Sequence, residues 1–125
     1  MSASVRFTKE HEWARVEGDV ATCGISDYAQ KALGDVVYVE LPKIGKQVKA
    51  GEQVAVVESA KAASEVYAPV SGEIVAVNDV LSKEPGKVNA AAMSDGWFFK
   101  IKPAAPPAND LMEEAAYQDY VKGLG

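Results

Sequence analysis

Two apolar runs flank a short polar interval near the middle of the chain, at residues 54–57 and 66–70. Runs rich in β-branched residues on both sides of a polar segment predict a β-hairpin, because strands that are adjacent in sequence pair readily. Lys61 lies in the centre of the interval, and alanines occupy positions 60, 62 and 63. The pattern therefore predicts a hairpin that displays one lysine at its tip.

The neighbours of this lysine leave two roles open. Glu58 and Glu65 lie on either side of Lys61, and nearby carboxylates keep a lysine protonated, which disfavours a catalytic Schiff base. A target for covalent modification needs exposure, small neighbours and a rigid support, which the alanines and the flanking strands provide. An ordinary exposed lysine is the alternative, because most lysines lie on protein surfaces.

Short strand-like runs separated by Gly and Pro turns fill most of the remaining chain, at 5–8, 14–17, 20–25, 35–41, 73–77 and 97–102. Eight to nine such strands predict a sandwich or a barrel. The pattern Gly-Glu-x-Val-Ala-Val begins at Gly51 and again at Gly72, 21 residues later. Unless the repeat arose by chance, it predicts similar strands on either side of the hairpin, in a structure with quasi-twofold halves.

Helical signals are confined to two places. Residues 27–33 are predicted to form a short helix between an N-cap at Ser26 and a glycine stop at Gly34. Residues 109–122 carry a broad apolar stripe at helical spacing and predict a second helix. Between them, residues 78–89 are predicted to form turns followed by a short extended piece.

Composition excludes several classes of function. The 125 residues suit one domain, and the net charge of −5 argues against nucleic-acid or anionic-membrane partners. The single Cys23 lies in an apolar run and is expected to be buried and inert, and the single His11 excludes a multi-histidine metal site. A dyad of these two residues stays open from the sequence. Residues 1–8 carry no targeting pattern, so the protein is expected to stay where it is made if the native chain starts here.

The residues around the lysine, together with several distant segments, resemble the glycine cleavage system H protein family. The matching segments follow one another in the order and spacing of that family, at 11–13 (His-Glu-Trp), 24–30, 33–42, 58–73, 85–89 and 95–97. They span nearly the whole chain, from about Phe7 to Tyr120. Ala60 is a departure, since valine is common at that position of the family.

The resemblance implies a mostly β fold of the lipoyl/biotinyl-domain type, which is a flattened hybrid barrel-sandwich with one short helix and a C-terminal helix. It implies a single lipoyl-carrier domain over residues 1–125, with the barrel at 1–103 and a C-terminal helical extension at 104–125. Lys61 would carry lipoic acid in amide linkage. No metal and no catalytic residue are implied.

The implied role is that of a shuttle in glycine catabolism. A PLP-dependent glycine decarboxylase would pass the aminomethyl group of glycine to the lipoyl disulfide and release carbon dioxide. A tetrahydrofolate-dependent aminomethyltransferase would take the methylene and release ammonia, and the FAD-dependent dihydrolipoamide dehydrogenase would reoxidise the dithiol. Lipoate-attaching enzymes are further partners. We expect a monomer in the bacterial cytoplasm, or in the mitochondrial matrix if a transit peptide has been removed.

In the family, the loaded arm folds into a cleft that protects the aminomethyl group from water. Glu12, Tyr28 and Glu65 match the positions that would line this cleft. Tyr28 departs from the histidine that is frequent there, and a phenol is a weaker proton carrier near neutral pH. Glu65 replaces a frequent aspartate.

Three other interpretations remain open from the sequence. Lipoyl domains of 2-oxo acid dehydrogenases and biotin carriers prefer Asp-Lys-Ala or Met-Lys-Met around the lysine, whereas this chain has Ala60-Lys61-Ala62. An H-protein relative that acts mainly as a lipoyl donor or relay would share nearly all the motifs. An unmodified interaction domain would leave Lys61 solvated.

Overall fold

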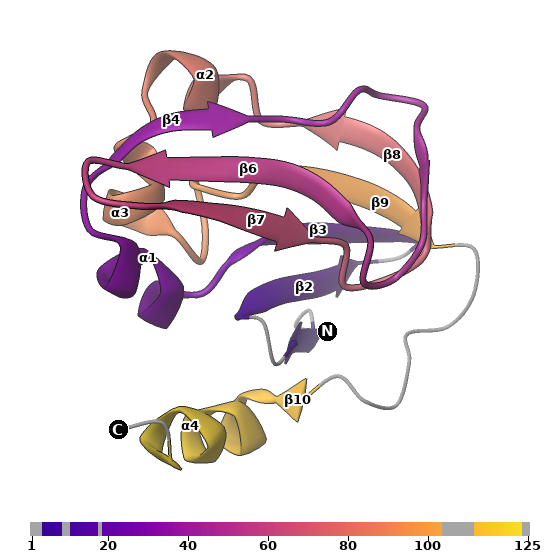
Figure 1. Ribbon diagram of the computed structural model, residues 1–125. Coiled ribbons are helices and arrows are strands. Elements are labelled where there is room, and N and C mark those ends of the chain that lie inside the picture. The colour runs from indigo at the N-terminus through magenta and orange to yellow at the C-terminus, as the bar shows by residue number, and fades with distance from the viewer. Residues whose placement is uncertain (1–3, 9–10, 18, 104–111, 124–125) are drawn as a thin grey trace.

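The structure, a computed structural model, describes residues 4–8, 11–17, 19–103 and 112–123 (Figure 1). These residues form ten strands and four helices. In chain order they are β1 (Ser4–Phe7), β2 (Glu12–Glu17), β3 (Val20–Ile25), α1 (Asp27–Leu33), β4 (Val36–Glu40), β5 (Gln47–Val48), β6 (Gln53–Ser59), β7 (Ala63–Tyr67), β8 (Gly72–Val77), α2 (Val80–Lys83), α3 (Lys87–Ala91), β9 (Phe99–Pro103), β10 (Met112–Glu113) and α4 (Glu114–Gly123).

The strands form two antiparallel sheets. The larger has the order β10-β1-β2-β3-β9-β8-β5 and the smaller the order β4-β6-β7. Figure 1 shows the small sheet lying across the larger one, with α4 on the other side of the molecule beside β1. The predicted mostly β fold with a short early helix and a terminal helix is confirmed. No helix in the described part of the chain is long and apolar enough to cross a lipid bilayer.

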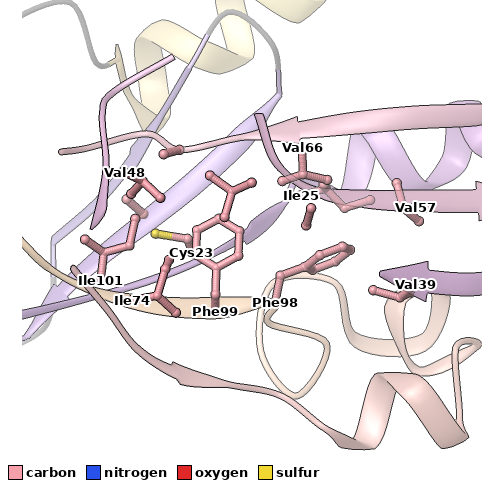
Figure 2. Packing of buried hydrophobic residues seen from close by; sticks show 14 of the residues in the cluster. Cys23, Ile25, Val39, Val48, Val57, Val66, Ile74, Phe98, Phe99 and Ile101 are labelled. Atoms are coloured by element: carbon pink, nitrogen blue, oxygen red, sulfur yellow. The ribbon is translucent and has the colours of Figure 1, made fainter. Parts of the chain in front are cut away.

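The main hydrophobic core lies between the two sheets (Figure 2). Val57 and Val66 of the small sheet face Phe99 and Ile101 of the large sheet, and all four side chains are 1% exposed or less. Successive residues of a strand point to opposite faces, so each sheet contributes every second side chain to this layer. The core therefore fixes which face of the β6–β7 hairpin points outward.

A second apolar cluster joins the C-terminal helix to the large sheet. Phe7, Trp13 and Tyr117 are buried together, and the rings of Phe7 and Tyr117 stack with centroids 4.2 Å apart. The indole of Trp13 also donates a hydrogen bond of 2.9 Å to the carbonyl of Ala92. Among the described residues of α4, Tyr117 is the buried one, so this side chain anchors the helix.

The predicted central hairpin is present, and its strands come closer to the lysine than the apolar runs at 54–57 and 66–70. Strand β6 pairs with β7 up to Glu58 and Ala63 and ends at Ser59, so the tip between the two strands has three residues, at 60–62. The polar residues at these strand ends are paired by backbone hydrogen bonds. A pattern of apolar side chains does not predict such pairing.

Helix α1 has the predicted bounds and caps. Ser26 is the N-cap, and its hydroxyl accepts the N–H of Ala29 at 3.1 Å. Gln30 donates to the Asp27 carboxylate at 2.8 Å. Gly34 ends the helix with φ +85° and donates its N–H to the carbonyl of Gln30 at 3.0 Å. A left-handed residue at this position satisfies a carbonyl that the helix leaves open.

The prediction of turns and an extended piece over 78–89 is wrong in part, because two short helices form there. They are α2 and α3, and α3 covers the residues expected to be extended. Leu81 and Val88 are fully buried in the main core. Tertiary packing of these two side chains overrides the local Pro-Gly signal.

The C-terminal helix begins later than the predicted 109–122. Met112 and Glu113 form β10, where they pair with Phe7 and Arg6 of β1, and the helix runs over Glu114–Gly123. The predicted start at 109–111 lies outside the described residues. The apolar stripe extends through Met112 because this residue packs on the second cluster from a strand instead of a helix.

The sequence repeat maps onto both sheets. The copy at 51–56 leads into β6 of the small sheet, and the copy at 72–77 forms β8 of the large sheet. Each copy therefore supplies a strand to a different layer on either side of the lysine hairpin.

Candidate functional site

Lys61 is exposed at the tip of the β6–β7 hairpin, and Ser59 holds this tip in shape. The Ser59 hydroxyl donates to the carbonyl of Ala62 at 3.1 Å and accepts the N–H groups of Lys61 and Ala62 at 3.3 and 3.0 Å. The backbone N–H of Ser59 also donates to the Ala62 carbonyl at 2.7 Å. These bonds satisfy the polar groups of the turn, so the lysine extends from an ordered support.

A cleft of about 190 Å³ lies beside the hairpin, between α1, the N-terminal part of β2 and strand β7. Its lining is His11, Glu12, Ile25, Tyr28, Ala29, Ala32, Leu33, Val57, Ser64 and Glu65. Half of these side chains are apolar, and the others carry two carboxylates, a phenol, an imidazole and a hydroxyl. Such a lining suits a thin apolar chain that ends in a polar or cationic group.

Glu12 is the buried acid of the cleft, at 2% exposure. Its carboxylate accepts the hydroxyl of Thr8 at 2.6 Å and the backbone N–H of Tyr67 at 3.4 Å. Because Thr8 follows β1 and Tyr67 ends β7, this carboxylate joins the two sheets at the cleft. The carboxylate gives the cleft an acceptor for a hydrogen-bond donor or a cation.

Glu65 and Tyr28 lie nearer to solvent. The Glu65 carboxylate accepts the hydroxyl of Tyr67 at 2.7 Å, which orients it along the outside of β7. Tyr28 is 37% exposed, and its ring centroid lies 4.7 Å from that of His11. The structure thus brings the three residues expected from the sequence, Glu12, Tyr28 and Glu65, to one cleft next to the lysine hairpin.

Sequence reasoning missed the place of His11 in the cleft. His11 has φ +70°, which is uncommon outside glycine. Its Nδ1 lies 2.8 Å from the hydroxyl of Tyr117, which in turn lies 2.7 Å from the hydroxyl of Ser26. The hydroxyl of Ser26 already accepts the N–H of Ala29. Each polar group has a partner when the Ser26 hydroxyl donates to the Tyr117 oxygen and the Tyr117 hydroxyl donates to Nδ1 of His11.

The only signal for this role was that His11 precedes Glu12 in the sequence. Nothing local indicates a contact between His11 and Tyr117, which are 106 positions apart. Ser64, which also lines the cleft, could have been found from its place next to Glu65.

The remaining candidate chemistry lies away from solvent. Cys23 is fully buried, and its thiol donates to the carbonyl of Ala21 at 3.6 Å. Burial, followed by the charge of Glu12, raises the pKa of the Cys23 thiol far above its ordinary range, so the thiolate is not accessible. The predicted buried, inert cysteine is confirmed. Within the described ranges, no three His, Cys, Asp or Glu side chains are grouped to hold a metal ion.

Comparison with known families gives one match over nearly the whole chain. A family model described as "Glycine cleavage H-protein" matches residues 5–124. Glycine cleavage system H proteins from Parvibaculum lavamentivorans and Xanthobacter autotrophicus are similar in sequence. The first is 58% identical over 123 residues, covering 98% of this chain and 98% of the relative. The second is 61% identical over 122 residues, covering 97% and 98%.

A solved structure agrees in fold as well. The crystal structure of a glycine cleavage system H protein from Mycobacterium marinum superposes with a TM-score of 0.88 at 32% identity, covering 98% of this chain and 99% of that chain. The likeness in fold therefore extends over nearly the whole chain.

Proposed function

The chain belongs to the glycine cleavage H-protein family, the lipoyl-bearing shuttle of the glycine cleavage system, and we propose that Lys61 carries the lipoyl group in amide linkage. The observation that carries this proposal is the exposed lysine on an ordered hairpin tip beside a cleft of matching chemistry. A transferase can reach this amine because its neighbours are alanines.

The residues of the cleft fit such an arm. Amide formation removes the charge of Lys61, so the stem can lie on the apolar side chains of Ile25, Leu33 and Val57. A lipoyl group supplies a cyclic disulfide on which a partner enzyme can load the aminomethyl group of glycine. Glu12 and Glu65 then accept the cationic amine of this cargo, while the apolar wall excludes water.

Tyr28 lines the same cleft and takes the place of a histidine. Its ring packs on His11 and covers the cleft from the side of α1. In this chain, His11 supplies an imidazole at the cleft, and Tyr28 acts as a wall.

The whole chain, residues 1–125, acts as one carrier domain and not as a catalyst. Membership in the glycine cleavage system implies partner enzymes, and those we assign are the decarboxylase, the aminomethyltransferase, dihydrolipoamide dehydrogenase and the lipoate-attaching enzymes. A monomer suits a shuttle that presents one arm to each enzyme in turn. The bacterial origin of the relatives supports a location in the bacterial cytoplasm.

Intact-mass analysis of the protein, purified from a host that attaches lipoate, tests the assignment of Lys61. We expect one lipoyl adduct in the natural chain and none in Lys61→Arg. Lys31 is a second exposed lysine near the cleft, and its variant Lys31→Arg should keep the adduct. An adduct that persists in Lys61→Arg, or no adduct in the natural chain, would overturn the assignment.

Reconstitution with glycine decarboxylase tests the shuttle role itself. The lipoylated protein should support exchange of labelled bicarbonate into glycine. Failure there, combined with donation of lipoate to other acceptor proteins, would favour a lipoyl donor over a shuttle.

A further inference from the structure

The side chain of Lys61 lies over Gly34, the residue that ends α1. A Cβ atom built on Gly34 would lie 3.3 Å from Cε and 3.9 Å from Nζ of Lys61. The first distance is closer than an ordinary van der Waals contact, so a Cβ at position 34 would push the lysine stem away by a few tenths of an ångström. The free space above Gly34 is therefore occupied by the stem of the residue that we assign as the modified one.

Other glycines show that the backbone alone does not account for this feature. Gly34, Gly45 and Gly51 all have a positive φ, of +85°, +95° and +87°, and the ψ of −157° puts Gly34 in a region that is essentially confined to glycine. A Cβ at Gly45 or Gly51 would meet nothing within 4 Å. All three positions favour glycine for conformational reasons. Among the three, Gly34 is the one whose missing side chain makes space that another side chain, that of Lys61, fills.

Backbone contacts of the hairpin place the lysine there. The N–H of Ala60 donates to the carbonyl of Asp35 at 3.1 Å, directly after Gly34. Ser59, on the other side of Ala60, is paired with Val36 across the β4–β6 ladder. These contacts hold the hairpin against the segment that follows Gly34, so the position of Lys61 does not depend on a side-chain rotamer alone.

Asn89 of α3 fixes the same turn from the other side. Its side-chain N–H₂ donates to the carbonyl of Gly34 at 2.8 Å and to the side-chain oxygen of Gln30 at 3.0 Å. Its side-chain oxygen accepts the N–H of Val36 at 2.8 Å. The turn at Gly34 is thus bonded on both flanks and cannot easily retreat from a side chain placed above it.

The cleft begins next to this turn. Leu33, the residue before Gly34, lines the cleft, and Ala32 and Ala29 continue the lining along α1 toward Tyr28. The helix rises about 1.5 Å per residue, so the path from Gly34 to Tyr28 is roughly 9 Å long. A stem that starts over Gly34 can follow the small side chains of α1 into the cleft.

We propose that Gly34 is a positioning residue: it seats the stem of Lys61 against the end of α1, so that a group carried on this lysine enters the cleft instead of extending into solvent. The inference rests on the proposed function, because it assumes that Lys61 carries the arm. A methyl group at position 34 lifts the stem from its seat. Its effect falls on docking of the arm, because the tip of the hairpin is exposed and a transferase still reaches the amine.

The experiment compares Gly34→Ala with Gly51→Ala, a control that places alanine at another glycine of positive φ where a Cβ meets nothing within 4 Å. Thermal unfolding should show a loss of stability in both, because alanine is strained at a positive φ. In the unmodified Gly51→Ala variant, nuclear Overhauser contacts between the methylenes of Lys61 and the Hα protons of Gly34 should match those of the natural chain. In Gly34→Ala the corresponding contacts of Lys61 should be lost.

The second readout is shielding of the cargo. The lipoylated proteins are reduced and loaded with formaldehyde and ammonium, where a thiol, formaldehyde and ammonia give the aminomethyl thioether and water. Release of formaldehyde is then followed after dilution, with free lipoamide as the unshielded reference. We expect Gly34→Ala to release its cargo about tenfold faster than the natural chain and Gly51→Ala, which corresponds to a tenfold larger undocked population of the arm.

The possible results separate this inference from the function on which it rests. Release from the natural chain as fast as from lipoamide would overturn the sheltering cleft itself. If the natural chain shields its cargo and Gly34→Ala shields it equally well, the role of Gly34 is overturned while the sheltering cleft stands. Unchanged contacts of Lys61 in Gly34→Ala would have the same meaning. If Gly34→Ala does not fold, the natural chain still tests the role: absence of nuclear Overhauser contacts between the Lys61 methylenes and the Hα protons of Gly34 would overturn it.

Discussion

Among the buried polar side chains of the described residues, Glu12 is the one acid, and its surroundings define what the cleft can hold. The hydroxyl of Thr8 and the backbone N–H of Tyr67 donate to its carboxylate and stabilise its charge. In a neutral amide of the same shape the oxygen can accept the N–H of Tyr67 and the N–H₂ can donate to the hydroxyl of Thr8, but the attraction for a cation is lost. Glu12→Gln therefore separates the electrostatic role of the residue from its packing.

We expect Glu12→Gln to be lipoylated at the natural rate and to lose its aminomethyl cargo about tenfold to a hundredfold faster. This range follows from ~1.5–3 kcal/mol for a hydrogen bond to a charged group. Glu17→Gln is the control, because Glu17 is an exposed acid at the opposite end of the same strand. Equal rates of cargo loss in the two variants would show that Glu12 does not bind the cargo.

Because of Tyr117, we expect the free energy of unfolding to depend on pH in the alkaline range. Burial raises the pKa of this tyrosine above its ordinary value of 10.0, against a smaller opposite effect of the Ser26 hydrogen bond. Below about pH 10 the hydroxyl is protonated in both the folded and the unfolded chain. As the pH rises further, the unfolded chain ionises first, so the free energy of unfolding falls until the folded pKa is passed.

Tyr117→Phe tests this dependence. The variant keeps the ring stack on Phe7 and loses the bonds to His11 and Ser26, which should lower the free energy of unfolding by about 1 kcal/mol near neutral pH. The gap between the natural chain and the variant should narrow as the pH rises above about 10, since phenylalanine does not ionise. Urea unfolding across this range measures it, with Tyr38→Phe, an exposed tyrosine of β4, as the control. A gap that widens with pH would contradict the assigned direction.

At the scale of secondary structure, local signals were sufficient where one element satisfies its own ends. Helix α1 could be predicted with its bounds, because Ser26 and Gly34 cap it from within the same segment. Strand β6 and its partner followed from their apolar residues, which face the core. Helix α3 and the start of α4 could not be predicted, because Val88 and Met112 are placed by contacts with distant elements.

The candidate site divides in the same way. Lys61 and the three cleft residues Glu12, Tyr28 and Glu65 were accessible through resemblance to a family, whereas composition and spacing alone left the lysine ambiguous. His11, Gly34 and Asn89 act through contacts between segments far apart in sequence, so no local pattern reveals them.

The side chain of Asn89 links three elements, so its removal should lower the free energy of unfolding more than is usual for a half-buried residue. Asn89→Ala removes the bonds to Gln30, Gly34 and Val36 at once. We expect the free energy of unfolding to fall by about 2–3 kcal/mol, because buried backbone groups lose their partners. Hydrogen exchange should accelerate first at the N–H of Val36. If this amide keeps its natural protection, Asn89 is not what holds the turn.

At the scale of the whole molecule, charge is concentrated on the outer face of the small sheet. Glu40 and Glu65 pair with Val56 from the two sides, and Glu58 lies two residues further along β6, so the three exposed acids share one face. This face borders the lysine tip. Enzymes that act on Lys61 should therefore approach an acidic surface, and basic patches on those enzymes would accelerate the encounter.

Glu40→Lys should lower kcat/KM for lipoate attachment several-fold at low ionic strength, and the difference should shrink at high salt. Glu17→Lys is the matched control, because it changes the net charge equally at the end of β2 remote from the cleft. Initial rates at two salt concentrations measure the effect. Equal losses in both variants would indicate net charge as the cause, and not the face beside the lysine.

The lysine and the buried acid of its cleft belong to different sheets, joined where Tyr67 donates to Glu12. The two traits can therefore be inherited separately. A descendant that kept the β6–β7 hairpin would remain a substrate for lipoate attachment even if drift in β2 removed the carboxylate. Such a lineage would retain the prosthetic group while losing the shelter, and it would be confined to handing on lipoate. Loss of the hairpin lysine, by contrast, would end both roles in one substitution.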